Sequence, residues 1–365
     1  MGSPLTFGII GVGKISEQYF SSLPSLPGIQ LVAVADLNEA RAAEVADEQG
    51  VKALTVDDLL ASPAIDAVLN LTIPAAHVDI DSRALEAGKH VFAEKPLALS
   101  TAEAAGLKGL ADRRGLRLGS APDTVLGTGV QTARAVLDSG LIGEAVGAAA
   151  FWAAPGHEAW HPAPLFYYQP GGGPLFDMGP YYLTSLITLL GPVVRVSGTV
   201  ARSARDRVVE TGPLAGTPVP VDVDTHVTAI LTHRSGVSST VTMSFEVWAS
   251  RAPHIEVFGT AGTLALPDPN LFSGVVEVFT QANPEWTAVE TLAGYEGAGR
   301  GYGLADMAHA IETDRPHRAS GDLAFHVLEI MEAILAAGAT DRVVDIVSSV
   351  ERPEAVPLGA RPNLW

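Results

Sequence analysis

The chain has 365 residues, which exceeds the usual size of one domain, so we expect two. Its content of 47% hydrophobic and 18% charged residues indicates a folded globular protein rather than a disordered chain. The formal net charge of -18 argues against nucleic acid or an anionic membrane as partner, and the absence of cysteine excludes disulfides, thiolate catalysis and cysteine metal sites.

The first third of the chain alternates short apolar runs with helical patterns. Continuous apolar strands separated by helices are typical of a parallel sheet covered on both faces. The expected strands are 5–10, 31–36, 67–72 and 90–96, and the expected helices are 14–23, 38–49, 76–88 and 101–113. Gly88 stands where a glycine would end the third of these helices.

The pattern changes after about residue 121. We expect a helix over 128–139, a strand over 145–152, a loop over 153–174 and a helix from Pro180 to Leu190, followed by an antiparallel meander over 193–292 and helices near 303–313 and 322–337. The predicted fold class is α/β: an N-terminal Rossmann parallel sheet over 1–121, then a C-terminal α+β domain over 122–365 with a large open, mostly antiparallel sheet.

The glycines after the first strand indicate a dinucleotide site. Gly11, Gly13 and Ser16 form a G-x-G-x-x-S turn, in which backbone N–H groups can approach a pyrophosphate. A plain strand-to-helix turn is the alternative. Asp36, twenty residues after Ser16, ends the next strand, where a carboxylate accepts hydrogen bonds from a ribose and repels a 2′-phosphate. NAD is therefore favoured over NADP, although Arg41 leaves NADP open.

Lys95 follows a strand in the tripeptide Glu94-Lys95-Pro96, at the edge where parallel sheets bind ligands. A solvated lysine is the alternative. The segment 69–100, "LNLTIPAAHVDIDSRALEAGKHVFAEKPLALS", closely resembles a stretch of the Gfo/Idh/MocA family, which contains glucose–fructose oxidoreductase and inositol dehydrogenase. The glycine loop, "LDSGLIGE", "GGGPLFDMG", "FGTAGTL" and "GDLAFHVLEIMEAI" extend the resemblance over most of the chain.

The resemblance implies hydride transfer between a nicotinamide lying between the two domains and a sugar or polyol carbon. It implies that Lys95 contacts the reacting oxygen. It further implies oligomers through the C-terminal sheet, as a homodimer or homotetramer. The residues expected at the cofactor are Gly11, Gly13, Lys14, Ile15, Asp36, Arg41, Thr72, Ile73, Pro74, His77, Glu94 and Lys95.

The family pattern G-G-G-x-x-x-D-x-G-x-H is matched over 171–181 except at its last position. Asp177 matches the aspartate, but Tyr181 replaces the histidine. On a helix, residues four apart share a face. A phenol ionises near pH 10 in its reference state, and a nearby ammonium such as Lys95 favours the phenolate. Tyr181 is the candidate acid or base and Asp177 a candidate catalytic residue; a helix N-cap and a packing tyrosine are the alternatives.

The segment "HEAWH" over 157–161 matches a zinc-peptidase signature, but prolines on both sides disfavour the helix that it needs. We expect no metal and interpret this stretch as a substrate loop, with a loop packed on the second domain as the alternative. Asp123 suits hydroxyl recognition or an interdomain hydrogen bond. The predicted substrate-binding residues are Lys95, Asp123, Trp160, His161, Tyr168, Asp177 and Tyr181.

The sequence therefore predicts an NAD-dependent sugar or polyol dehydrogenase or ketoreductase. An NAD-dependent glycoside hydrolase of the same fold and a non-catalytic sensor are the alternatives. No charged leader and no run of 18 apolar residues is present, so we expect a soluble, cytoplasmic protein.

Overall fold

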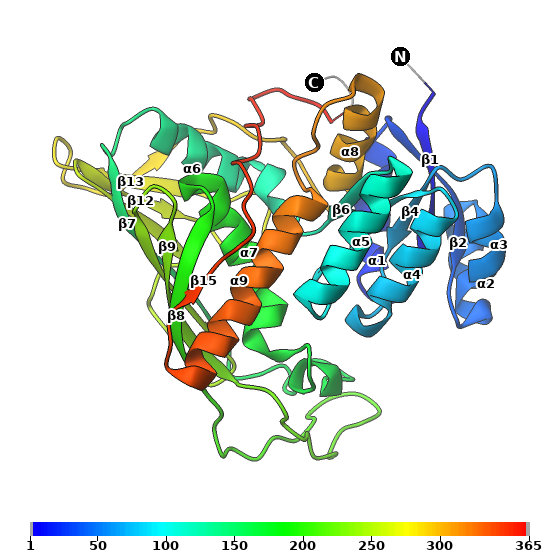
Figure 1. Ribbon diagram of the computed structural model, residues 1–365, viewed down its shortest axis with the longest axis horizontal. Helices are drawn as coiled ribbons and strands as arrows, with labels where there is room; N and C mark the ends of the chain where they lie inside the picture. Colours follow the sequence, from blue (N-terminus) through cyan, green and yellow to red (C-terminus); the bar gives the residue numbers. More distant parts are fainter. Residues whose placement is uncertain (1–2, 363–365) are drawn as a thin grey trace. The chain divides into compact units, whose positions relative to one another are not determined.

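The computed structural model describes residues 3–362, which form two compact units that alternate along the sequence (Figure 1). The first unit contains the chain up to Gln131, the segment Thr291–Leu328 and the segment from Pro353. The second unit contains Thr132–Glu290 and Glu329–Arg352. The chain thus leaves the first unit and returns to it twice.

This division differs from the single cut after residue 121 that the sequence predicts. The helix α8 (Tyr302–Thr313) belongs to the first unit, although it lies near the C-terminus. Leu304 and Met307 of α8 share one buried cluster with Phe92. Because these apolar contacts join residues about two hundred positions apart, sequence patterns do not reveal them.

The first unit is built on a six-stranded parallel sheet with strand order β3-β2-β1-β4-β5-β6, as predicted for a Rossmann domain. Its strands are β1 (Leu5–Ile10), β2 (Ile29–Ala35), β3 (Lys52–Ala53), β4 (Ala67–Asn70), β5 (His90–Ala93) and β6 (Leu118–Ser120). Its helices are α1 (Ser16–Ser22), α2 (Glu39–Gln49), α3 (Val56–Ala61), α4 (Pro74–Glu86), α5 (Thr101–Arg114) and α8, with short turns of 3₁₀ helix at η1 (Leu23–Ser25) and η2 (Thr124–Leu126).

The second unit is built on a nine-stranded sheet with order β14-β13-β12-β11-β7-β10-β9-β8-β15. Every neighbouring pair is antiparallel except β10 with β7, so the prediction of a mostly antiparallel sheet is confirmed. The strands are β7 (Ala145–Ala153), β8 (Val193–Ala201), β9 (His226–His233), β10 (Ser238–Ser244), β11 (Ile255–Gly259), β12 (Gly262–Leu266), β13 (Val276–Thr280), β14 (Thr287–Val289) and β15 (Val344–Asp345).

Two long helices pack on this sheet (Figure 1). The helix α7 (Gly173–Leu190) contacts β7, β9 and β10, and α9 (Gly321–Thr340) packs across Gly198 of β8 and beside Gly179 of α7. The helix α6 (Thr128–Asp138) precedes β7, and the 3₁₀ helix η3 (Leu165–Tyr168) precedes α7. One face of the sheet is therefore covered by helices.

The start of α7 corrects a prediction. The sequence predicts a helix from Pro180, but α7 begins at Gly173, with Pro174 in its first turn and Pro180 inside it. Gly172 just before it lies so close to the Phe166 and Tyr167 carbonyls that a Cβ would be 2.6 Å from both oxygens. The glycine run therefore lets the chain pass tightly over η3 and enter the helix two turns early.

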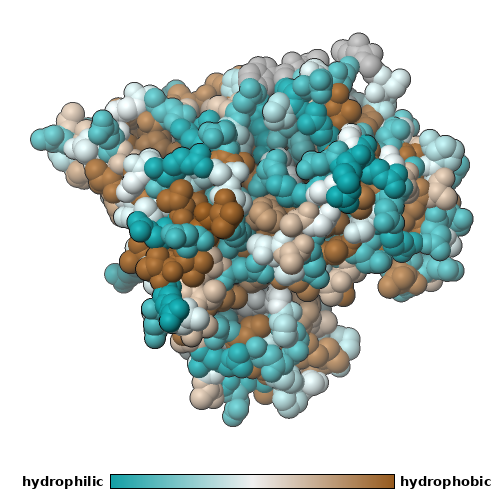
Figure 2. All heavy atoms as spheres, in the orientation of Figure 1, coloured by the Kyte–Doolittle hydropathy of each residue, from teal (hydrophilic) through white to brown (hydrophobic). Residues whose placement is uncertain are grey.

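Apolar side chains also occur outside the core. On the face shown in Figure 2, hydrophilic side chains alternate with small hydrophobic patches, which is ordinary for a protein surface. The helix α9 is long and apolar enough to cross a membrane by length and composition alone. Half of that stretch is buried inside the structure, as in the core helix of a globular protein.

Candidate active site

The glycine loop of the first unit fits a dinucleotide pyrophosphate. Gly11 has φ +95, and a Cβ there would lie 2.8 Å from the Leu71 carbonyl, so only glycine fits between β1 and β4. A Cβ on Gly13 would meet no atom within 4 Å, so open space lies beside the loop. The close backbone approach and the open space are the two features that a bound pyrophosphate requires.

The Asp36 carboxylate lies next to this loop, at the end of β2. One oxygen accepts a hydrogen bond from the Val12 N–H at 2.8 Å, and the other accepts from the Asn38 N–H at 2.8 Å. Arg41 pairs with Glu44 at 3.2 Å, within α2. The carboxylate is thus held beside the glycine loop by two backbone N–H groups.

Five more predicted cofactor residues lie at the surface of the first unit, near the glycine loop and after β4. Lys14 is exposed and pairs with Glu17 at 2.7 Å, and Ile15 is half-buried beside it. Thr72, Ile73 and Pro74 join β4 to α4, and Ile73 is 65% exposed. These side chains are accessible to a ligand.

His77 differs from its neighbours because it is completely buried. Its Nδ1 lies 2.8 Å from the Pro96 carbonyl oxygen and its Nε2 lies 3.0 Å from the Thr72 carbonyl oxygen. Burial lowers the pKa of this imidazole. The ring therefore holds two loops of the first unit in place, and the prediction that it lines the nicotinamide cleft is corrected to a supporting role.

Lys95 is half-buried at the end of β5, and Glu94 fixes its backbone. The Glu94 carboxylate accepts hydrogen bonds from the Lys95 N–H at 3.0 Å and from the Tyr19 hydroxyl at 2.8 Å. Burial, and after it the Glu94 charge, raise the pKa of Tyr19, so this phenol stays a neutral donor. Glu94 is itself buried and positions the lysine from below the surface.

Asp123 has a structural task in place of the predicted substrate contact. It is completely buried, and its Oδ2 accepts hydrogen bonds from the Gly301 N–H at 2.9 Å and the Gly303 N–H at 3.0 Å. Burial raises the pKa of this carboxyl, while the Arg300 guanidinium opposes the change. Asp123 therefore holds the start of α8 within the first unit.

The helix α7 carries the candidate acid and base residues of the second unit. Asp177 and Tyr181 are four residues apart and share one helix face. Asp177 lies inside the helix and Gly172 is the N-cap, so the alternative that Asp177 caps the helix is wrong. Tyr182 is completely buried, and its hydroxyl lies 2.8 Å from His254 Nδ1, which agrees with the prediction that it belongs to the core.

The sequence analysis missed a histidine at this site. His157 Nε2 lies 2.7 Å from Asp177 Oδ2, and their side chains are only 7% and 11% exposed. His157 belongs to "HEAWH", which forms a turn and not the helix of a zinc peptidase. The only feature of the sequence that could have pointed to His157 was the replacement of the family's histidine by Tyr181. That replacement suggests that another histidine lies near Asp177.

The next residue, Glu158, anchors this turn in the interior of the second unit. Its Oε1 lies 2.6 Å from Arg207 Nη1, and both side chains are at most 2% exposed. The Tyr168 hydroxyl donates to Glu158, and burial, followed by this hydrogen bond, raises the pKa of Tyr168. Tyr168 is completely buried, so its prediction as a substrate-binding residue is corrected to a structural role.

An aromatic cluster surrounds His157 at the surface of the second unit. Trp160 is 58% exposed and Phe166 is 44% exposed. His161 lies between them, with ring centroids 5.2 Å from Trp160 and 5.6 Å from Phe166. Burial and the neighbouring His157 lower the pKa of His161, so its ring is neutral at pH 7. These rings offer apolar faces with polar edges.

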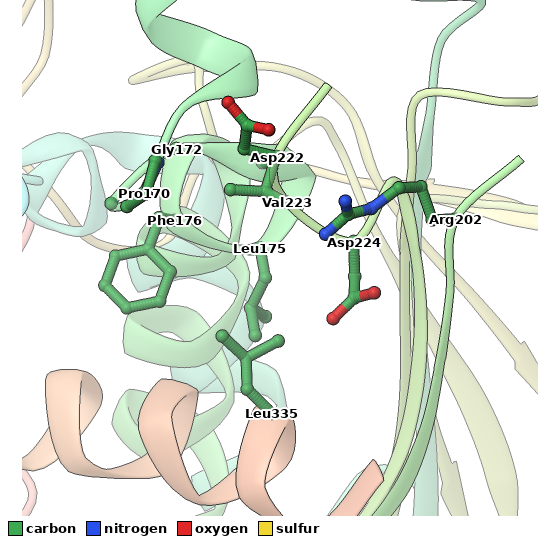
Figure 3. Close-up of a pocket in the computed structure, with 11 residues that line it drawn as sticks. Pro170, Gly172, Leu175, Phe176, Arg202, Asp222, Val223, Asp224 and Leu335 are labelled. Atoms are coloured by element: carbon green, nitrogen blue, oxygen red, sulfur yellow. The ribbon is translucent and has the colours of Figure 1, made fainter. Parts of the chain in front are cut away.

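A pocket of about 260 Å³ lies near the start of α7, apart from the Asp177 and Tyr181 side chains. Its walls come from Gly171–Gly173, the segment Asp222–Asp224 and Arg202. Figure 3 shows Leu175 of α7 and Leu335 of α9 next to one another in this pocket. None of the lining residues is one of the predicted site residues.

Comparisons with known proteins give the following matches. Residues 5–121 match the profile of the oxidoreductase family with an NAD-binding Rossmann fold (GFO/IDH/MocA), and residues 130–265 match the C-terminal domain of the same family. The dTDP-3,4-didehydro-2,6-dideoxy-alpha-D-glucose 3-reductase of Streptomyces antibioticus is 34% identical over 272 residues, which cover 73% of this chain and 76% of the relative.

Two further proteins are similar over much of the chain. The inositol 2-dehydrogenase of Rhizobium meliloti (strain 1021) is 28% identical over 71% of this chain and 74% of its own. The crystal structure of an NAD-binding oxidoreductase from Klebsiella pneumoniae superposes with a TM-score of 0.81 at 23% identity, covering 95% of this chain and all of that one. The structural likeness supports the fold.

Proposed function

This chain belongs to the GFO/IDH/MocA family of NAD-binding oxidoreductases, and we propose that it transfers hydride between NAD and a hydroxyl- or carbonyl-bearing carbon of a sugar or polyol. The observation that carries the proposal is the pair Asp177 and Tyr181 on one face of α7. A proton donor and a hydroxyl-binding carboxylate, one helical turn apart, suit a polyhydroxylated substrate.

The residues around the glycine loop fit NAD, which supplies or accepts the hydride when it is bound. Gly11 and Gly13 leave room for the pyrophosphate, and Asp36 is held ready for the ribose hydroxyls. A carboxylate there repels a 2′-phosphate, so we propose that NAD is preferred over NADP. The pairing of Arg41 with Glu44 supports this preference, because Glu44 competes with a phosphate for the guanidinium.

Lys95 is proposed to bind the reacting oxygen. Its ammonium is a donor with a positive charge, which stabilises negative charge as it develops on an alkoxide. The Glu94 carboxylate fixes the backbone from which the side chain extends. No lysine occurs after Lys108, so a lysine in this role must come from the first third of the chain.

Tyr181 is proposed to move the proton. In reduction its phenol gives the proton to the oxygen that becomes a hydroxyl, and in oxidation it takes that proton back. A neutral phenol is a better donor than acceptor at neutral pH, so reduction of a carbonyl is the proposed direction. The similarity to a dTDP-sugar 3-reductase supports this direction.

Asp177 and the aromatic cluster are proposed to hold the substrate. A carboxylate accepts a hydrogen bond from a sugar hydroxyl, and the exposed rings of Trp160 and Phe166 can stack on its C–H groups. The same chemistry applies to a polyol. Asp123 and Tyr168 have no part in this proposal, because Asp123 accepts hydrogen bonds from the start of α8 and the Tyr168 hydroxyl donates to Glu158.

We further propose that the protein acts in the cytoplasm as a homodimer or homotetramer through the uncovered face of the nine-stranded sheet. On this face Ile230 of β9 is 51% exposed and Phe258 of β11 is 37% exposed. Gly147 and Ala149 of β7 lie between them in register and allow close approach. Sedimentation analysis tests this: an Ile230→Glu variant is expected to dissociate, and an unchanged sedimentation coefficient contradicts the proposal.

The absorbance of the reduced nicotinamide tests the proposed activity in both directions. NAD and NADP are offered with sugars, polyols and inositols, and NADH is offered with keto-sugars. We expect a change with NAD or NADH and one group of substrates. No change in either direction, while calorimetry detects NAD binding, contradicts the proposal. Release of free sugar from a glycoside without net NAD reduction identifies a hydrolase instead.

A further inference from the structure

We propose that His157 is a positioning residue for the reaction, which holds the Asp177 carboxylate through the Nε2–H of one fixed tautomer. The inference rests on the proposed function, because it assigns Asp177 to the substrate. Asp177 is part of the family's motif, whereas His157 lies twenty residues before it and outside that motif.

The tautomer of His157 follows from a second hydrogen bond. The Trp160 indole Nε1 lies 3.2 Å from His157 Nδ1. An indole N–H can only donate, so Nδ1 must carry a lone pair and the ring proton must be on Nε2. That proton points at Asp177 Oδ2, 2.7 Å away. The histidine therefore donates to the carboxylate, and Trp160 donates to the histidine.

The indole contact also limits which ring nitrogen donates. An N–H on Nδ1 would face the Trp160 N–H, so the contacts favour the ring with its N–H on Nε2. The Nε2–H donor orients the Asp177 carboxylate as an acceptor for a substrate hydroxyl.

The surroundings of His157 hold the ring in place. Its backbone N–H donates to the Tyr168 hydroxyl at 3.0 Å. Its ring lies against Tyr167 and Phe245, with centroid separations of 4.4 Å and 4.7 Å. The buried pair of Glu158 with Arg207 fixes the adjacent residue. Because the His157 ring is held from several sides, we expect its Nε2–H to keep the Asp177 carboxylate in one position.

The same hydrogen bonds separate the roles of the two candidate proton carriers. His157 Nδ1 is occupied by the indole, and Nε2–H is occupied by Asp177, so the imidazole has no free site for proton exchange with substrate. Tyr181, one turn further along α7, is then the proton carrier. His157 therefore does not take over the catalytic role of the histidine that the family has where this chain has Tyr181.

Three variants test the positioning role. His157→Phe keeps the ring contacts and removes the donor, and His157→Gln restores an N–H near the position of Nε2. His254→Phe is the matched control, because it removes a histidine hydrogen-bonded to a core tyrosine of the same unit. We expect His157→Phe to lower kcat/KM by about 10- to 100-fold at unchanged melting temperature, since misplacing a substrate-binding group has effects of this size.

His157→Gln is expected to recover at least about tenfold of that loss, and His254→Phe is expected to keep wild-type kinetics. Wild-type kinetics in His157→Phe overturn the inference, and so does a glutamine variant as impaired as the phenylalanine variant. Failure of the wild-type protein itself to reduce or oxidise any substrate contradicts the proposed function instead, so the two failures are distinguishable.

A spectroscopic measurement tests the tautomer without any activity. In protein labelled with nitrogen-15 at histidine, the His157 resonances, assigned from the His157→Gln spectrum, are expected to show Nε2–H and an unprotonated Nδ1 at pH 7. Trp160→Phe removes the indole donor and is expected to give a mixture of tautomers. An Nδ1–H or doubly protonated His157 in the wild-type protein overturns the inference.

Discussion

The two units prepare their candidate sites in different ways. In the first, the Gly11 loop, Asp36 and Lys95 each follow a strand of one parallel sheet, so strand order alone brings their backbones to one edge. In the second, Asp177 is held by His157 from a loop, and that loop is held by Arg207, 49 residues after Glu158. The first site therefore depends on short motifs, and the second on long-range contacts between buried polar groups.

The largest effect is expected at the lysine of the first unit. Lys95→Met keeps the length of the side chain and removes its charge, so kcat is expected to fall by at least about 10³-fold. Calorimetry is expected to show unchanged NAD affinity, because the glycine loop and Asp36 are untouched. Lys52→Met, on the exposed strand β3, is the matched control and keeps full activity. Full activity in Lys95→Met contradicts the scheme.

Tyr181→Phe tests the second unit in the same assay. Loss of the phenol proton is expected to lower kcat by about 10²- to 10³-fold, the usual contribution of general acid catalysis. Tyr182→Phe, one residue along the same helix, removes a hydroxyl that faces His254 and is expected to keep kcat. Equal kinetics in the two variants would show that Tyr181 is a packing residue.

Arg207→Met tests whether the second site depends on its buried scaffold. It removes the buried one of the two guanidinium groups that pair with Glu158 and leaves only the partly exposed Arg205, so the free energy of unfolding is expected to fall by about 3 kcal/mol. Arg234→Met breaks a pair with Glu351 in which both partners are exposed, and is expected to change stability by less than about 1 kcal/mol. Thermal unfolding measures the stability of both variants. Equal losses of stability in Arg207→Met and Arg234→Met would contradict the prediction.

Asp36→Ser tests the cofactor preference of the first unit. Removing the carboxylate removes its repulsion of a 2′-phosphate, so the ratio of NAD to NADP affinity is expected to fall by about tenfold. Asp47→Ser, on the exposed side of α2, is the matched control. An unchanged ratio of NAD to NADP affinity in Asp36→Ser would show that another residue determines the cofactor preference.

A last prediction concerns Asp81, a buried carboxyl beneath the first site, whose effect on stability is spread over several pH units. Burial raises its pKa to about 7, against 3.8 ordinarily, although the Asn70 amide donates to it. The folded state then keeps a proton that the unfolded state loses above pH 4, so the stabilisation is lost as pH rises toward 7. Relative to Asp81→Asn, the wild-type protein is expected to lose about 1 kcal/mol per pH unit over this range, measured by urea unfolding. Parallel pH curves contradict this.

The two units also differ in how much of their structure the sequence predicts. The strands β1, β2, β4 and β5 of the first unit and the helix end at Gly88 depend on neighbouring residues, and the structure has them close to where local patterns place them. The short α3 (Val56–Ala61) and the two-residue strands β3 and β15 are too short for a periodic signal, and the sequence analysis did not predict them.

The second site was predicted only in part, for a physical reason. Asp177 and Tyr181 lie within one motif and were predicted to share a helix face, as they do in α7, whereas His157 reaches Asp177 only because the chain folds a loop back onto α7. Tyr168 was predicted to face a substrate because an aromatic residue in a loop suits a sugar. Its burial depends on Arg207, which a sequence pattern does not connect to it.

The most direct test of the account is the transfer of hydride itself. The wild-type protein is given NADH that carries deuterium at the transferable position of the nicotinamide ring, together with the keto-sugar that the absorbance assay identifies, and the product is examined by mass spectrometry. The account predicts that the product gains one deuterium on the carbon that bore the carbonyl, in equal amount to the NADH consumed. Product without deuterium at that carbon would contradict it.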